Sequence, residues 1–494
     1  MKKGIKYILG IVLMIGMSSC GSDWLDLNPT TSVATSDALS TVSDLQIALN
    51  GAYRQLGSHY LFGDYAVYGP ELKGEYMQCA QASSSGYTFY TFTQSSGDEN
   101  TLSTWYYGYQ LIHYVNNILG AIDNSGNFDA TDSDVKEIRS ESLALRALTT
   151  FVLTNMYGQA YTISPSSLGV CLLSEDEGID YMPARSTVSD CYTQIVSDFK
   201  EALDGLSTSK SNGYINKWAA EGLLSRVYLY MGDYQDALTY AKDVINNSPY
   251  ELCSNDNYAA MWGQDFPAES LFEIYYSSTE TVGYEYFGTR YCGTNYKNIT
   301  VTDKYLDLLN EDPNDVRHCF TQELDNTVYS VEGTDTTYIS AWLTKYPGKS
   351  SSGASVTNPT VPQYCDCYVL RLSELYLTAA ECDFRLNGTS GSALTYLNAI
   401  VNRANPNKTL TASDLSVDRI FEERVRELVG EGVSAVYDLL RTRGASGTIN
   451  HTGGRHLTMT NSSVACNSNM IPSPIPTNEI SNNPNIEQNP GYSN

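Results

Sequence analysis

Residues 216–249 read NKWAAEGLLSRVYLYMGDYQDALTYAKDVINNSP, and this stretch has the clearest structural pattern in the chain. Apolar and small side chains recur there at spacings of three and four residues, which is typical of amphipathic helices. Gly232 and Asp233 interrupt the spacing, and Pro249 ends it. A small residue such as Ala237 on the inner face lets two antiparallel helices approach closely. The stretch therefore predicts a helical hairpin.

One hairpin cannot bury its apolar stripe alone, so further helices must pack against it. The same helical spacing occurs at 43–53, with Ser43 or Asp44 as the N-cap, and at 110–122, 134–157, 187–206, 368–387, 392–403 and 417–440. Residues 57–110 and 254–360 lack this period and read as loops and short strands. The sequence thus predicts a mainly α fold, a tetratricopeptide-like scaffold of helical hairpins with a loop-rich, short-strand insertion.

The N-terminus has the form of a secretory signal. Lys2, Lys3 and Lys6 precede an apolar run at 8–17, and small residues lead to Cys20. The run is too short to remain as a membrane-spanning anchor. A cysteine at this place resembles the lipidation site of a bacterial lipoprotein, which would hold the protein on a membrane surface. The alternative is an ordinary signal peptide with a cysteine there by chance.

The sequence contains no long linker of low complexity, so we expect one large body after the leader. The predicted parts are a signal peptide at 1–19, a lipidated tether at 20–36 and a single compact domain at 37–494. Within that domain, helical repeats occupy about 37–250 and 366–443, the insertion about 254–362, and a C-terminal tail 444–494.

Composition excludes some partners. The net charge of −26 repels nucleic acid and anionic lipid, so binding to either as a main role is not expected. Tyr occurs 39 times against 12 Phe, which predicts a surface that is more aromatic and polar than ionic. The cysteines after Cys20 are spaced irregularly and specify neither a disulfide framework nor a zinc site.

The sequence carries no clear motif for catalysis or metal binding. The histidines show no metal spacing, and neither His-Glu-x-x-His nor Gly-x-Ser-x-Gly occurs. Gly348-Lys349-Ser350 resembles the end of a phosphate-binding loop, but Leu343 replaces its first glycine. A glycoside hydrolase needs only two carboxylates, and among 56 acidic residues such a pair is uninformative. We therefore expect no metal, no cofactor and no enzymatic activity.

Short motifs follow one another along nearly the whole chain. They are Asp23-Trp24-Leu25-Asp26, Ala48-Leu49-Asn50-Gly51-Ala52-Tyr53, Leu145-Arg146-Ala147, Leu223-Leu224-Ser225-Arg226-Val227-Tyr228-Leu229, Arg371-Leu372-Ser373-Glu374-Leu375-Tyr376-Leu377, Val401-Asn402-Arg403-Ala404, Glu431-Gly432, Asp438-Leu439 and Gln488-Asn489-Pro490-Gly491-Tyr492. In this order they resemble the SusD/RagB family of glycan-binding lipoproteins of Bacteroidetes. The chain departs from the family pattern at 433–437, which is one residue longer, and at Arg443, where the family has an aromatic residue.

The resemblance implies a function and a partner. It implies a lipid-anchored protein on the outer face of the outer membrane, seated as a lid on a SusC-like TonB-dependent transporter. Such a protein captures oligosaccharides and delivers them to the channel. A peptide or another nutrient is the alternative ligand. The family has no catalytic residues to carry over, and its ligand contacts lie in variable loops.

Sugar chemistry suggests which side chains could contact a ligand. The C–H face of a sugar ring stacks on an aromatic ring, and its hydroxyls pair with carboxylates and carboxamides. Both kinds of side chain occur in the two loop-like regions. The candidate ligand contacts are Tyr65, Tyr68, Glu75, Tyr87 and Tyr90 in the first region, and Tyr284, Tyr286, Tyr291 and Trp342 in the second. A pure peptide-binding scaffold would not need this aromatic enrichment.

Overall fold

The stretch at 216–249 forms the predicted hairpin. Helix α9 (Lys217–Met231) is capped by the Asn216 side chain, which accepts a hydrogen bond from the backbone N–H of Ala219. Gly232 follows in the left-handed conformation, with φ of 78°, and the side chain of Asp233 caps α10 (Tyr234–Asn247). The turn thus ends one helix and starts the next, as the sequence predicts.

The computed structural model describes residues 38–80, 84, 86–173, 180–277, 279–292, 299–323, 327–331, 334–338, 341–348, 365–432, 435–452 and 459–493. At residues 284, 322–323, 327–331 and 334–338 only the backbone is described. The signal peptide at 1–19, Cys20 and the tether at 20–36 lie outside these ranges. Within them, no helix has the length and apolar character that a membrane crossing requires.

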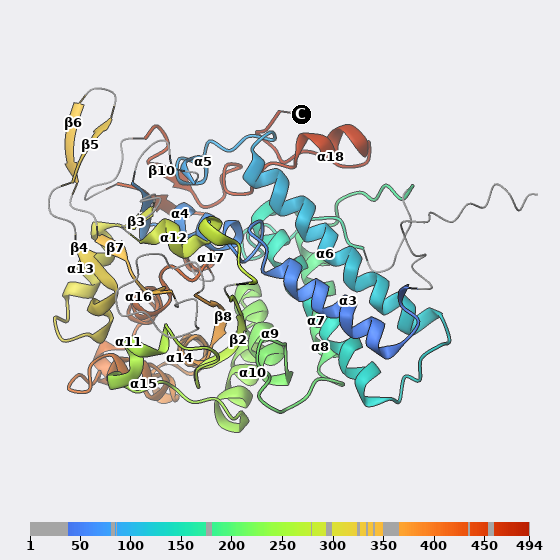
Figure 1. Ribbon diagram of the computed structural model, residues 1–494. Helices are drawn as coiled ribbons and strands as arrows, with labels where there is room; N and C mark the ends of the chain where they lie inside the picture. Colours follow the sequence, from blue (N-terminus) through green and yellow to red (C-terminus); the bar gives the residue numbers. More distant parts are fainter. Residues whose placement is uncertain are drawn as a thin grey trace, which may run out of the picture.

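Helices dominate the architecture, as predicted (Figure 1). The remaining α-helices are α3 (Val42–Leu56), α4 (Tyr65–Lys73), α5 (Tyr87–Tyr90), α6 (Glu99–Asn124), α7 (Ser133–Tyr157), α8 (Val188–Ala202), α11 (Tyr258–Met261), α12 (Phe287–Tyr291), α13 (Asp303–Asn310), α14 (Leu372–Asn387), α15 (Ala393–Ala404), α16 (Val417–Leu428), α17 (Ala435–Arg443) and α18 (Thr477–Asn482). Consecutive long helices pack in pairs: α6 on α7, α7 on α8, α9 on α10 and α14 on α15. Helix α10 also packs on α14, so the helical array continues after the insertion.

Short strands join the two loop-like regions. Strand β1 (Met77–Cys79), from the first region, pairs antiparallel with β3 (Ile299–Val301), from the second. With β7 (Ala341–Leu343) and β4 (Thr321–Glu323) they form a sheet of order β1-β3-β7-β4. The other strand pairs are β2 (Ser270–Ile274) with β8 (Cys367–Arg371), β5 (Thr327–Val331) with β6 (Thr334–Tyr338), and β9 (Thr448–Asn450) with β10 (Ser463–Ala465).

Several predicted boundaries are wrong. The segment 57–110 is not a loop, since it holds α4, α5 and the first part of α6. Helix α4 escaped detection because all its residues are buried, so it has no amphipathic period, and it contains Pro70. The predicted helix at 417–440 is two helices, α16 and α17, because Gly430 and Gly432 adopt positive φ between them.

Smaller differences concern helix ends and the insertion. Helix α3 is capped by Thr41, and Asp44 is not the cap but the N3 residue, whose side chain completes the capping box. The insertion contains the short helices α11, α12 and α13 beside its strands. Residues 368–371 belong to strand β8, and α14 begins only at Leu372.

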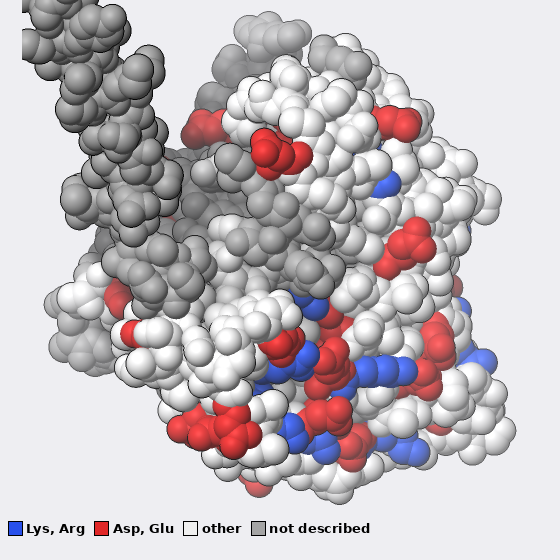
Figure 2. Space-filling model, turned by 90° about the vertical axis from the view of Figure 1, so that its right-hand side faces the viewer, with Lys and Arg blue, Asp and Glu red and all other residues white. Residues whose placement is uncertain are grey.

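One hydrophobic core cluster runs from Leu39 to Ile486 and so joins helices, insertion and tail. The cysteines after Cys20 are all free thiols in this structure. Figure 2 shows one face of the molecule, on which acidic and basic side chains intermix over the lower part while uncharged side chains predominate above. Ion pairs also link the helices, as where Arg139 of α7 contacts Asp123 of α6 and Glu201 of α8 at 2.8 and 2.7 Å.

Candidate functional site

A buried ion pair holds the two tyrosine-rich regions together. Asp64, at the N-terminus of α4, accepts hydrogen bonds at 2.7 and 2.8 Å from Nε of Arg290, which lies in α12. Both side chains are buried, with at most 2% exposed. The Arg290 guanidinium lies 5.3 Å from the centre of the Tyr68 ring, a cation–π contact. The structure thus joins segments that are 226 residues apart in the sequence.

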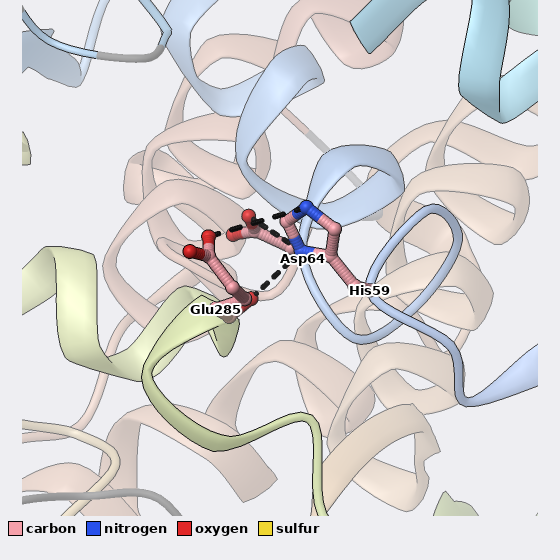
Figure 3. Close-up of side chains that lie close together, drawn as sticks. All are labelled: His59, Asp64 and Glu285. Carbon is pink, nitrogen blue, oxygen red and sulfur yellow. Dashed lines mark hydrogen bonds and ion pairs between the residues drawn. The ribbon is translucent and has the colours of Figure 1, made fainter.

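His59 lies beside Asp64 and Glu285 (Figure 3). Its Nδ1 is 3.2 Å from an oxygen of Asp64 and 3.0 Å from the backbone oxygen of Glu285, so Nδ1 carries a proton. Its Nε2 is 3.1 Å from the hydroxyl of Tyr65. Burial by itself would lower the pKa of His59, but the hydrogen bond and the charge of Asp64 outweigh it and raise the pKa.

Aromatic rings extend this group of side chains toward solvent. The rings of Tyr60 and Tyr107 stack in parallel with their centres 4.0 Å apart, and both side chains are partly exposed. The ring of His59 contacts Tyr60 at 4.9 Å. Tyr106, next on α6, is 53% exposed. We call His59, Tyr60, Tyr65 and Tyr107 the His59 edge.

His59, Asp64 and Glu285 are also residue types that ligate metals. One possible ligand atom from each of the three lies within 4.8 Å of the others. However, Arg290 already contacts both carboxylates, at 2.9 Å in the case of Glu285. A guanidinium in this position supplies the positive charge that a metal would supply. The chemistry of the cluster is therefore that of a charge-assisted hydrogen-bond network, which orients His59 and the α4–α12 junction.

Most of the candidate contacts are buried in this structure. Tyr68, Tyr90, Tyr286, Tyr291 and Trp342 are at most 2% exposed, and Tyr65 is 5% exposed. Their partners are other parts of the protein, because aromatic rings pack wherever an apolar surface is available. The Tyr90 ring, for example, stacks on that of His451 at 4.8 Å.

The other candidates have different surroundings. Glu75 is fully buried and forms ion pairs with Lys304 and Arg443, and the latter stands where the related family has an aromatic residue. Burial would raise the pKa of Glu75, but these partners lower it. Tyr87 is partly exposed in α5. The side chain of Tyr284 lies outside the described residues.

The structure brings Tyr65 and Tyr68 of α4 together with α12, the helix that carries Tyr291, so the two regions meet there. Sequence reasoning missed His59, Tyr60, Asp64, Tyr107 and Arg290. No local signal marks them, because their contacts join distant segments. The partly exposed rings can stack on an apolar ring face, and the Glu285 carboxylate can accept hydrogen bonds from hydroxyls.

Comparison with known proteins supplies an independent line of argument. Residues 23–229 match a family model described as "Starch-binding associating with outer membrane". Residues 284–492 match a family model described as the SusD family. The two matches lie on either side of the hairpin's second helix and together include most of the chain.

Three similar proteins cover most of the chain. A SusD superfamily protein from Bacteroides thetaiotaomicron has a crystal structure with 36% sequence identity and a TM-score of 0.83, covering 91% of this chain and 100% of that one. A SusD superfamily protein from Bacteroides vulgatus has 33% identity and a TM-score of 0.83, covering 92% and 100%. The starch-binding protein SusD of Bacteroides thetaiotaomicron is 26% identical over 433 residues, 73% of this chain and 74% of that protein.

Proposed function

This chain belongs to the SusD family, and from that premise we propose that it is a carbohydrate-binding protein of the bacterial outer membrane. The observation that carries the proposal beyond family membership is the His59 edge. Two tyrosine-rich segments meet there on a rigid ion pair, and partly exposed rings lie beside hydrogen-bonding groups. A preformed aromatic and polar surface of this kind suits a neutral oligosaccharide.

The proposed ligand contacts follow from exposure. Tyr60 and Tyr107 present ring surface, while the exposed carboxylate of Glu285 presents polar atoms. The hydroxyl of Tyr65 holds the His59 ring in place through a hydrogen bond with Nε2. Tyr87 and Tyr284 stay in the proposed set, whereas the fully buried tyrosines and Trp342 have the role of holding the loops in place.

The finer proposals concern anchoring and delivery. We propose that Cys20 carries lipid, that the protein faces the exterior, and that it passes oligosaccharides to a SusC-like TonB-dependent transporter without cleaving them. Antibody labelling of intact cells tests the orientation, and signal only after permeabilisation would contradict it. Co-purification of a transporter with the detergent-extracted lipoprotein tests the partner.

Calorimetric titration tests the binding proposal. The probes are maltoheptaose, laminarihexaose, xylohexaose, mannohexaose and chitohexaose, with a mixed-peptide sample as the comparison, added to residues 21–494. We expect saturable binding of one glycan class and an affinity about tenfold lower for Tyr60→Ala, since loss of a stacked ring costs on the order of 1 kcal/mol or more. Tyr275→Ala is the matched control, because Tyr275 is 42% exposed and lies after β2, on another element.

The outcomes separate the possible ligands. Binding of peptides alone would replace the carbohydrate by a peptide ligand. Equal affinity of the wild type, Tyr60→Ala and Tyr275→Ala for a glycan would move its site away from the His59 edge. Release of shorter sugars during prolonged incubation, followed by chromatography, would contradict binding without catalysis.

A further inference from the structure

A groove of about 600 Å³ adjoins the His59 edge, because Tyr106 in its wall contacts Tyr107 with ring centres 5.1 Å apart. Its walls are the first half of α6, the segments 171–173 and 181–183, and the C-terminal helix α18. Figure 1 shows α18 next to the N-terminal end of α6, close to the end of the chain. The volume is in the range of ligand pockets in proteins.

The floor of the groove is rigid. The Tyr109 hydroxyl accepts a hydrogen bond from the backbone N–H of Cys171 at 2.7 Å and donates one to its carbonyl at 2.8 Å. The Asn116 amide donates to the carbonyl of Leu173 at 3.1 Å, and that of Asn483 donates to the carbonyl of Pro183 at 2.9 Å. These bonds fix α6, α18 and both segments relative to one another, so the groove is preformed.

The rim of the groove carries exposed aromatic rings and side-chain amides. Tyr106, Gln110 and Tyr114 follow one another at four-residue spacing on one stripe of α6. Tyr106 and Tyr114 are 53% and 36% exposed, and Tyr181 on the facing segment is 46% exposed. Within the described part of the chain, the side-chain amides of Gln110 and Asn482 form no hydrogen bond. Aromatic rings and side-chain amides that are available for hydrogen bonding therefore lie together around the opening of the groove.

We propose that this groove is a second oligosaccharide-binding site, which adjoins the His59 edge at Tyr106. The rings of Tyr106, Tyr114 and Tyr181 would stack on sugar faces, and Gln110 and Asn482 would bond hydroxyls. No Lys or Arg is among the described residues that line the groove, so it offers an anionic ligand no counter-charge.

Among the described residues of the lining, Glu479 is the only carboxylate, which is consistent with a neutral ligand. Burial raises the pKa of Glu479, while a hydrogen bond with Trp105 lowers it to a smaller extent. This carboxyl group is thus partly withdrawn from water and tied to the floor. The proposal deepens the carbohydrate function, on which it rests, by adding a second site with its own residues.

The test is titration of residues 21–494 with the same five oligosaccharides, followed by the variants Tyr114→Ala/Tyr181→Ala and Gln110→Ala. We expect a second saturable step in the wild type that the double variant weakens tenfold or more and Gln110→Ala weakens less. Tyr60→Ala should leave this step intact and weaken the other one. Tyr275→Ala, matched in exposure, should leave both steps unchanged, and circular dichroism confirms that each variant is folded.

Several results would overturn the proposal. They are a single binding step that the groove variants do not change, binding of peptides but not glycans to the groove, and no glycan binding by the wild type at all. A Tyr60→Ala variant that leaves both steps unchanged, while the groove variants weaken one of them, would instead refute the His59 edge as a site. The two assignments can therefore fail separately.

Discussion

At the scale of single residues, the charge of His59 should make the stability of the protein depend on pH, because His59 contacts Asp64 where the two loop-like regions meet. Its pKa is raised because Asp64 outweighs the effect of burial, so the charged form is favoured in the folded state. This stabilisation is present below the unfolded pKa of about 6.5 and is lost as pH rises through the folded pKa. We predict that His59→Gln lowers the free energy of unfolding by up to about 1 kcal/mol at pH 5.5 and has little effect at pH 9.

Urea unfolding of the two proteins across this pH range measures the difference. His113→Gln is the matched control, since His113 is exposed on α6. A loss of stability that is the same at pH 5.5 and pH 9 would mean that packing, not charge, is what His59 contributes.

Glu141 responds to pH in another way. It is buried in α7, and the hydroxyl of Tyr53 donates a hydrogen bond to it. Burial raises its pKa to about 8, so the folded state holds a proton that the unfolded state releases near pH 4.5. Stability therefore falls as pH rises from 4.5 to 8.

We predict that Glu141→Gln keeps the acceptor for Tyr53 and removes the cost of charging. The variant should match the wild type near pH 5 and exceed it by a few kcal/mol at pH 9, because one pKa unit corresponds to about 1.4 kcal/mol. Thermal unfolding at both pH values measures this. A variant that is less stable at pH 9 than the wild type would contradict the raised pKa.

For single residues of the site, the sequence predicts the kind of side chain but not its exposure. Composition indicates that Tyr68, Tyr90 and Tyr291 belong to aromatic-rich segments, but it does not indicate which way each ring points. All three are buried. The sequence does not indicate that Tyr60 and Tyr107 are partly exposed and adjacent, because this follows from the stacking of the Tyr60 ring on Tyr107 of α6.

At the scale of elements, a glycine in a turn and a glycine inside a helix should respond oppositely to a methyl group. Gly232 has φ of 78°, and among the described residues a Cβ there would meet only Thr162, at an ordinary contact distance. Gly232→Ala should therefore cost about 1 kcal/mol of stability through backbone strain alone. Gly120 lies inside α6 with open space around it, so Gly120→Ala should stabilise by about 0.4–1 kcal/mol. Urea unfolding of both variants measures the signs, and the prediction fails if the two signs agree.

Helices with one solvent-exposed face are easier to predict from the sequence than helices that are buried on all sides. Helices with one solvent face, such as α8, α10 and α15, keep the helical period and were predicted nearly to their ends. Helix α4 is buried on all sides, and α12 is only one turn long, so neither has a period to detect. The break between α16 and α17 depends on backbone angles at Gly430 and Gly432 that the flanking pattern does not reveal.

At the scale of the whole molecule, a buried network of charges fastens the insertion to the helices. Arg371, at the end of β8, contacts Glu431 at 2.7 Å, Glu269 at 2.6 Å and Glu427 at 3.0 Å, and none of these side chains is more than 3% exposed. Lys345 of the insertion contacts Glu431 at 2.6 Å. Two carboxylates of α16 thus form buried ion pairs: Glu427 with Arg371 and Glu423 with Arg317.

Arg371→Met should destabilise the protein by about 3–5 kcal/mol at pH 7, because three buried carboxylates then lose their shared counter-charge. Those carboxylates would become easier to protonate, so the loss should be smaller at pH 5. Arg139→Met is the matched control: Arg139 also contacts two carboxylates, but it is 29% exposed and should cost no more than about 1 kcal/mol. Urea unfolding at both pH values measures the four differences. If Arg371→Met were as mild as Arg139→Met, the network would not be what holds the insertion, and the β1–β3 pairing and the Asp64–Arg290 pair would have to carry that role.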